Sequence, residues 1–126
     1  MVKVNSTTKI EAAIDSFQRG KMLIVVDDED RENEGDFIIG GELATSDDIN
    51  FMMKYGRGLL CVSITEETSI RLDLSLMVSS NTSLHETNFT VSVDAVKNAT
   101  TGISANDRWE TVQVLVNDNS KPEDLA

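Results

Sequence analysis

The sequence of 126 residues contains only one cysteine, one histidine, one proline and one tryptophan. A single cysteine excludes an internal disulfide framework and is typical of a reducing compartment, so we expect a cytoplasmic protein. No apolar run approaches the roughly 18 residues of a membrane span. The first five residues also lack the hydrophobic core of a secretory signal. We therefore expect neither a membrane protein nor a secreted one.

Basic residues are scarce as well. Eleven Lys and Arg residues stand against 22 Asp and Glu, which gives a formal net charge of −11. This overall field would repel nucleic-acid phosphates and anionic lipids, so we predict no nucleic-acid partner and no membrane partner. A local basic pocket for one small phosphate remains compatible with the charge. The composition, 40% hydrophobic and 26% charged, is that of an ordinary globular protein.

Apolar periodicity and turn residues predict helices that alternate with strands. Three pairs have the spacing of helix N-terminal caps: Thr8 with Glu11, Thr45 with Asp48, and Ser104 with Asp107. The expected helices lie at 8–20, 45–56, 65–72 and after 104, and the expected strands at 22–26, 37–39, 58–64 and 89–94. This order predicts an α/β (α+β) fold, a mixed-sheet sandwich with flanking helices, formed by a single domain over residues 1–126.

The ten residues 27–36, directly after the first expected strand, hold seven carboxylates and one arginine. In an extended segment Glu32, Glu34 and Asp36 would project to the same side, because strand side chains alternate. Three carboxylates on one face can ligate Mg²⁺ or Mn²⁺ and leave one free as a general base. Arg31 would then point to the opposite face unless the chain kinks there. The simpler interpretation is a solvated acidic face.

Other interpretations of single features stay open. Residues 30–35 match the start of an EF-hand loop, but Gly41 stands where a bidentate glutamate is needed. Cys61 is expected to be a small buried thiol, or else a thiol that lines a pocket. His85 is expected at the surface, or as a partner of that thiol. Residues 100–104 lead into a helix and can hold an anion there, or can simply cap the helix.

Four blocks, in this order, resemble the 3,4-dihydroxy-2-butanone 4-phosphate synthase family of riboflavin biosynthesis. They are residues 25–36 (VVDDEDRENEGD), 56–61 (GRGLLC), 89–95 (FTVSVDA) and 100–108 (TTGISANDR). The resemblance implies a homodimeric lyase that converts ribulose 5-phosphate to 3,4-dihydroxy-2-butanone 4-phosphate and formate with Mg²⁺ (or Mn²⁺). It implies a metal ligand at Glu32, catalytic roles for Glu34, Asp36 and Cys61, and substrate contacts at Arg31, Glu32, Asp36, Asp27 and Thr101.

The family pattern continues beyond the position of Ala126 into an Arg-Pro-Gly-His segment and an Arg-x-Gly-His-Thr-Glu segment, which this sequence lacks. In the family the second segment supplies a histidine metal ligand and the main phosphate contact. We therefore expect a C-terminally truncated domain that is inactive alone and that exposes apolar surface. The alternatives are a non-catalytic acidic fragment that binds a divalent metal, or a remnant with no activity.

Overall fold

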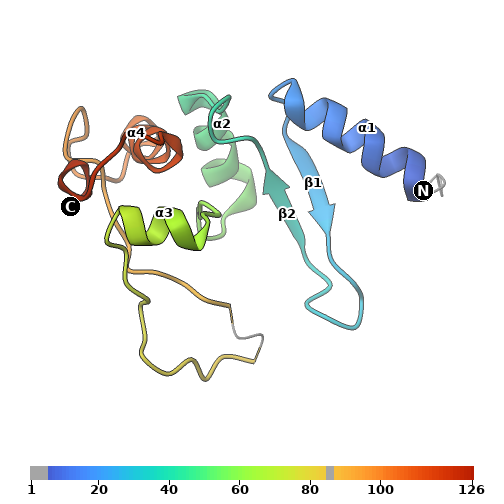
Figure 1. Ribbon diagram of the computed structural model, residues 1–126. Coiled ribbons are helices and arrows are strands. Elements are labelled where there is room, and N and C mark those ends of the chain that lie inside the picture. The colour runs from blue at the N-terminus through green and yellow to red at the C-terminus, as the bar shows by residue number, and fades with distance from the viewer. Residues whose placement is uncertain (1–5, 85–86) are drawn as a thin grey trace. The chain divides into compact units, whose positions relative to one another are not determined.

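The computed structural model describes residues 6–84 and 87–126. The chain divides into two compact units, Met1–Leu60 and Cys61–Ala126, which we call the first and second units. The first contains two helices, a π-helical turn and an antiparallel hairpin, and the second contains two α-helices and a 3₁₀ turn. Figure 1 shows these elements in chain order. Helices and a small antiparallel sheet confirm the α+β class that the sequence predicts.

The first unit begins with helix α1 (Ser6–Gln18), which starts two residues before the expected cap at Thr8. The helix ends at Gln18, two residues before the expected end at Gly20, whose φ of 71° lies in the left-handed region that favours glycine after a helix. The Gly20 amide donates to the carbonyl of Phe17 at 2.9 Å. Helix α1 leaves apolar residues uncovered, since Ile10 is 62% exposed and Ile14 is 53% exposed.

Strands β1 (Leu23–Val26) and β2 (Gly35–Ile38) form an antiparallel hairpin. Leu23 pairs with Ile38 at one end and Val26 pairs with Gly35 at the other. The sequence therefore places both strands correctly, although β2 begins two residues earlier than predicted. Because the hairpin closes at Val26 and Gly35, the acidic residues 27–34 form the loop at its tip.

Helix α2 (Ser46–Phe51) begins with the predicted capping box, in which Thr45 accepts from the Asp48 amide and Asp48 accepts from the Thr45 amide. Ile49 is its buried anchor, with only 2% of its surface exposed. The helix continues into a π-helical turn, η1 (Met52–Gly56), instead of ending as a regular α-helix. The ring of Phe51 lies 5.5 Å from that of Phe37, so α2 packs against the base of the hairpin.

The second unit contains helix α3 (Glu66–Arg71), helix α4 (Ala105–Val116) and the 3₁₀ turn η2 (Pro122–Asp124). The two helices match the predicted segments and are capped by Thr65 and Ser104. Leu72 and Val112 are buried in this unit. The guanidinium of Arg71 donates to the carbonyl of Ser120 at 2.6 Å and so ties α3 to the chain after α4.

Two predicted strands are wrong in this structure. Residues 58–64 are apolar and lack helical structure, but they form no ladder with any other described segment. Residues 89–94 make only an isolated bridge, from Thr90 to Leu76, and Ala95 makes another to Leu125. Alternating side chains indicate a possible strand, but a strand forms only where a neighbour offers a continuous row of hydrogen bonds.

Candidate active site

The acidic loop is organised around the carboxylate of Asp27, at the end of β1. Asp27 Oδ1 accepts from the amide of Glu34 at 2.9 Å, and Oδ2 accepts from the amide of Glu32 at 3.0 Å. Oδ2 also accepts from Nη1 of Arg31 at 2.9 Å. These contacts, led by the Glu34 amide, hold the pKa of Asp27 below its ordinary value. Asp27 is therefore an ionised anchor for the loop.

Residues 29–32 of the loop form turns, so the extended arrangement in which Glu32, Glu34 and Asp36 would share one side is not present. Asn33 has a φ of 52°, in the left-handed region, and Asp27 holds the amides on both sides of it. The resulting kink lets Arg31 turn back toward acidic side chains. Its Nη1 reaches Asp27, and its Nη2 lies 3.5 Å from Oε1 of Glu32. Arginine and acids thus share one side of the loop.

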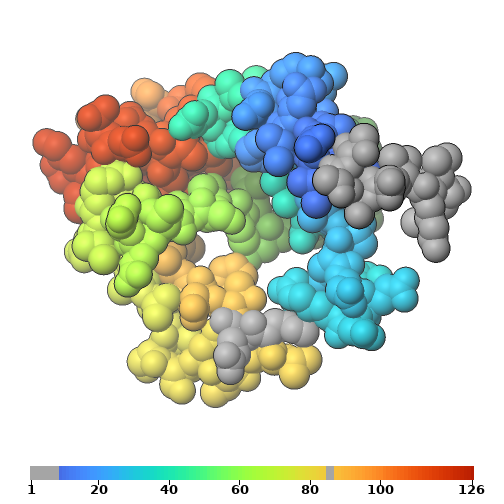
Figure 2. All heavy atoms as spheres, turned by 45° about the vertical axis from the view of Figure 1, so that its right-hand side comes forward, coloured from blue at the N-terminus to red at the C-terminus, as the bar shows by residue number. Residues whose placement is uncertain are grey.

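The remaining acids of the loop have different surroundings. Asp28 accepts from the amide of Asp30 at 2.9 Å, and Asp28, Glu29 and Asp30 are exposed, as a solvated face requires. Glu34 and Asp36 are also exposed. Figure 2 shows the loop, in cyan, protruding from the hairpin with its side chains open to solvent on the visible face.

The EF-hand interpretation is wrong. An EF-hand loop lies between two helices, whereas strands β1 and β2 flank this loop. The loop is also held by Asp27, which precedes residues 30–35 and accepts hydrogen bonds from the amides of Glu32 and Glu34. The EF-hand pattern has no such contact.

The described residues do not form a complete metal cage. Among residues 6–84 and 87–126, no three His, Cys, Asp or Glu side chains gather closely enough to hold a metal ion. Magnesium commonly takes only one or two carboxylates from a protein and fills its other positions with water and substrate oxygens. A carboxylate of the loop is therefore compatible with a role as one ligand among several, but the described residues do not form a metal site by themselves.

Cys61 is exposed, so the expectation of a buried thiol is wrong. It begins the second unit and lies in the segment 58–64 that forms no ladder, which explains why its side chain is not covered by a sheet. His85 lies outside the described residues, so its proposed pairing with Cys61 has no structural account.

Thr101 lies in a loop fixed by a side chain that the sequence indicated only as a helix cap. The Asp107 carboxylate, buried with 3% exposed, accepts from Thr100 Oγ1 at 2.8 Å and from the Gly102 amide at 3.1 Å. The hydrogen bond from Thr100 is the main cause that lowers the pKa of Asp107. Ser104 caps α4 as predicted, by accepting from the Asp107 amide. Thr101 itself is exposed.

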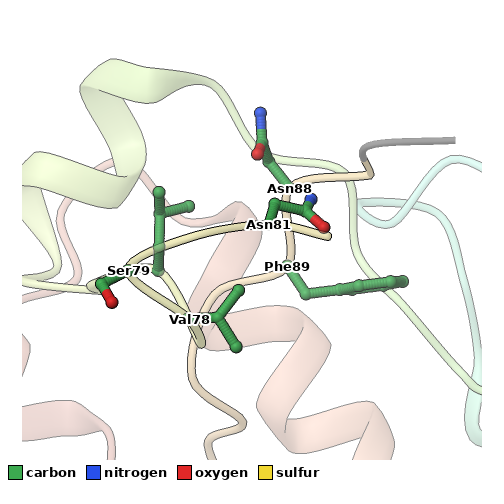
Figure 3. A pocket seen from close by; sticks show the side chains of 6 residues that line it. Val78, Ser79, Asn81, Asn88 and Phe89 are labelled. Atoms are coloured by element: carbon green, nitrogen blue, oxygen red, sulfur yellow. The ribbon is translucent and has the colours of Figure 1, made fainter. Parts of the chain in front are cut away.

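A separate pocket of about 200 Å³ lies in the second unit, lined by Leu76, Val78, Ser79, Asn81, Asn88 and Phe89. In Figure 3 the side chains of Val78 and Phe89 lie below the amide groups of Asn81 and Asn88. None of the candidate site residues lines this pocket.

No helix in the described part of the chain is both long and apolar enough to cross a membrane.

Comparison with known proteins identifies relatives along nearly the whole chain. A synthase of Agrobacterium fabrum, 3,4-dihydroxy-2-butanone 4-phosphate synthase, is 55% identical over 118 residues, which are 94% of this chain and 55% of the relative. The riboflavin biosynthesis protein RibBA of Porphyromonas gingivalis is 54% identical over 126 residues, 99% of this chain and 30% of the relative. The chain thus spans about half the length of the first and less than a third of the second.

Solved structures agree. A 3,4-dihydroxy-2-butanone 4-phosphate synthase in complex with two magnesium ions matches 93% of this chain and 55% of its own, with a TM-score of 0.90 at 39% identity. The synthase of Candida albicans matches 93% of this chain and 57% of its own, with a TM-score of 0.81 at 44% identity. The sequence model of the 3,4-dihydroxy-2-butanone 4-phosphate synthase family matches residues 11–126. This chain belongs to that family.

Proposed function

We propose that this chain serves the reaction for which its family is named, the conversion of ribulose 5-phosphate to 3,4-dihydroxy-2-butanone 4-phosphate and formate in riboflavin biosynthesis. The observation that carries the proposal is the ordered loop at the tip of the hairpin. Asp27 holds the amides of Glu32 and Glu34 and the guanidinium of Arg31, so charged groups of the family motif share one fixed backbone. Fixed charges of both signs suit a reaction that develops an enediolate.

The side chains of the loop and of β2 divide the work. Arg31 offers a permanent positive charge to a substrate oxygen, and Asp36 accepts hydrogen bonds from sugar hydroxyls. Glu34, an exposed carboxylate, moves the proton that enolisation releases next to the carbonyl. From the family resemblance, we assign a catalytic role to Cys61 and a substrate contact to Thr101.

Glu32 is the side chain of this chain that would hold Mg²⁺ or Mn²⁺, and it also contacts the substrate. A bound divalent ion would polarise carbonyl and hydroxyl oxygens and balance negative charge. The relative solved with two magnesium ions supports a divalent metal in the family. From the family resemblance, we further propose that the active form is a homodimer. We also propose that the protein works in the cytoplasm, since a single cysteine fits a reducing compartment.

A test of this function measures formate from ribulose 5-phosphate labelled with ¹³C at C4, by ¹³C NMR in the presence of Mg²⁺. Two proteins are compared: the 126-residue chain, and the same chain joined to the part of the Agrobacterium fabrum synthase that it does not match. We expect labelled formate from the hybrid. We expect none from the chain alone, because its described residues do not form a metal site by themselves.

Two substitutions in the hybrid test the loop. Glu32→Gln removes the proposed metal ligand and should abolish turnover. Glu29→Gln is the matched control, because Glu29 is an exposed acid of the same loop with no proposed role. A folded hybrid that releases no formate, or equal loss in both variants, would contradict the proposal. If Mg²⁺ raises the melting temperature of the chain and neither protein turns over, a non-catalytic metal-binding module is the better description.

A further inference from the structure

The buried carboxylate of Asp107 departs from the usual behaviour of an acid at its position. Asp107 is the third residue of α4, where the acid of a capping box would accept from the backbone amide of the capping residue. Ser104 does perform its half of that exchange, by accepting from the Asp107 amide at 3.0 Å. The carboxylate also accepts from Thr100 and Gly102, in the loop that precedes Ser104. It is used to hold the preceding loop.

Two of the hydrogen bonds that the Asp107 carboxylate accepts bracket a single residue. Thr100 is held through its hydroxyl and Gly102 through its amide, and both bonds end on Oδ2. Gly102 has a φ of 77°, so the chain turns in the left-handed region immediately after Thr101. With the residues before and after it fixed to one carboxylate oxygen, Thr101 has a defined position in the loop before α4, while its own side chain stays exposed.

Helix α4 also fixes Asp107 from behind. The backbone carbonyl of Asp107 accepts from Thr111 Oγ1 at 3.1 Å, and the same Oγ1 accepts from the amide of Ala95 at 2.9 Å. Thr111 and Ala95 are both buried. Asp107, which holds the loop, is therefore joined by hydrogen bonds to buried residues of the second unit, and this connection restricts the loop as well.

We propose that Asp107 is a positioning residue, which acts through Thr100 and Gly102 to present Thr101 to the sugar phosphate substrate. The inference rests on the proposed function, because it takes the substrate from there. An ordinary helix cap needs only Ser104, which is present. A buried carboxylate costs free energy unless it is fully hydrogen-bonded, and here the bonds that compensate it are those that shape the loop.

The test uses the full 126-residue chain, labelled with ¹⁵N and titrated with ribulose 5-phosphate in the presence of Mg²⁺. In the wild type the amide signals of Thr101 and Gly102 should move on titration. Thr100→Val keeps the shape of the side chain but removes the hydroxyl that donates to Asp107, and should weaken the dissociation constant about 3- to 10-fold. Thr100→Ser retains the hydroxyl and should restore binding. A merely structural role would not distinguish these two exposed-site variants by their affinity.

Asp107→Asn replaces one carboxylate oxygen by an NH₂ group that cannot accept a hydrogen bond, and it should weaken substrate binding at least as much as Thr100→Val. Should it fail to fold, the Thr100 pair still decides. Equal affinity of Thr100→Val and Thr100→Ser overturns the inference, as does a wild type whose Thr101 and Gly102 signals do not respond to the sugar phosphate. The formate assay is independent of this result: binding at the loop without turnover refutes the proposed reaction alone, and turnover without a response at the loop refutes the inference alone.

Discussion

Replacement of Gly102 by alanine should destabilise the second unit, for two reasons that the structure gives separately. The φ of Gly102 is 77°, and an alanine in the left-handed region costs about 1–2 kcal/mol. A Cβ at this position would also overlap the carboxylate of Asp94. Because the Asp94 side chain is exposed and can rotate, we assign that overlap only about 0.5–1.5 kcal/mol.

One contribution has the opposite sign. Alanine restricts the unfolded chain more than glycine does, which favours the folded state by about 0.4–1 kcal/mol. We therefore expect Gly102→Ala to lower the free energy of unfolding by about 2 kcal/mol, a change of roughly 30-fold in the folding equilibrium. Urea unfolding measures it, followed by the fluorescence of Trp109, the single tryptophan, and by far-UV circular dichroism.

Two controls separate the contributions. Gly58→Ala places a Cβ with no atom within 4 Å and without a positive φ, so it should leave stability unchanged or slightly raised. Asp94→Ala combined with Gly102→Ala removes the overlap but keeps the backbone cost, and should recover part of the loss. A Gly102→Ala variant as stable as the wild type would refute the reasoning, and no recovery in the double variant would refute the overlap with Asp94.

Three further predictions concern other parts of the chain. Arg71→Met removes a partly buried, charge-assisted hydrogen bond to a carbonyl and should lower the free energy of unfolding in urea by about 1–2 kcal/mol. Arg19→Met breaks only an exposed ion pair and should lower it by about 0–0.5 kcal/mol. The pKa of Asp27 is lowered in the folded chain, so the ionised carboxylate stabilises the fold above the ordinary aspartate pKa, and this stabilisation is lost as the pH falls below about 4. The Asp27→Asn variant should lack this part of the acid dependence when melting temperatures are measured as a function of pH. Ile24 and Val26 are 68% and 63% exposed on β1, so the chain should associate with rising concentration in light scattering, and Ile24→Thr with Val26→Thr should reduce the association.

Each of these has a result that would contradict it. Equal losses for the two arginine variants would mean that the bond between α3 and the chain after α4 contributes nothing specific. Identical acid melting of the wild type and Asp27→Asn would remove the loop anchor from the stability of the fold. If the double threonine variant associates as strongly as the wild type, the surface through which the chains associate lies outside β1.

Local signals predicted the elements with their own short-range hydrogen bonds. The capping box of Thr45 and Asp48, the cap at Ser104 and the end of α1 within two residues of Gly20 all depend on residues within a few positions of each other, and the structure confirms them. The hairpin strands could also be placed, because an apolar run, a polar loop and a second apolar run together leave few alternatives to a hairpin.

Features set by distant or unusual contacts were not predictable in the same way. The kink at Asn33 depends on one carboxylate, that of Asp27, capturing two amides further along the chain, a choice that side-chain alternation does not encode. The loop-holding role of Asp107 was concealed by its equally good spacing as a cap. Residues 58–64 and 89–94 have strand-like composition, but composition carries no information on whether a partner strand is available.

The π-helical turn η1 has a consequence for the comparison of related sequences. A π turn contains one residue more per hydrogen-bonded turn than an α turn, so Met52–Gly56 behaves as an α-helical stretch that has accepted an insertion. A homologue that is one residue shorter here would close as a plain α-helix, and everything downstream would rotate by about 100° around the helix axis. Arg57, which leaves η1 with a φ of 57°, would then emerge in a different direction. In a homologue that is one residue shorter, the alignment gap should therefore fall inside this turn.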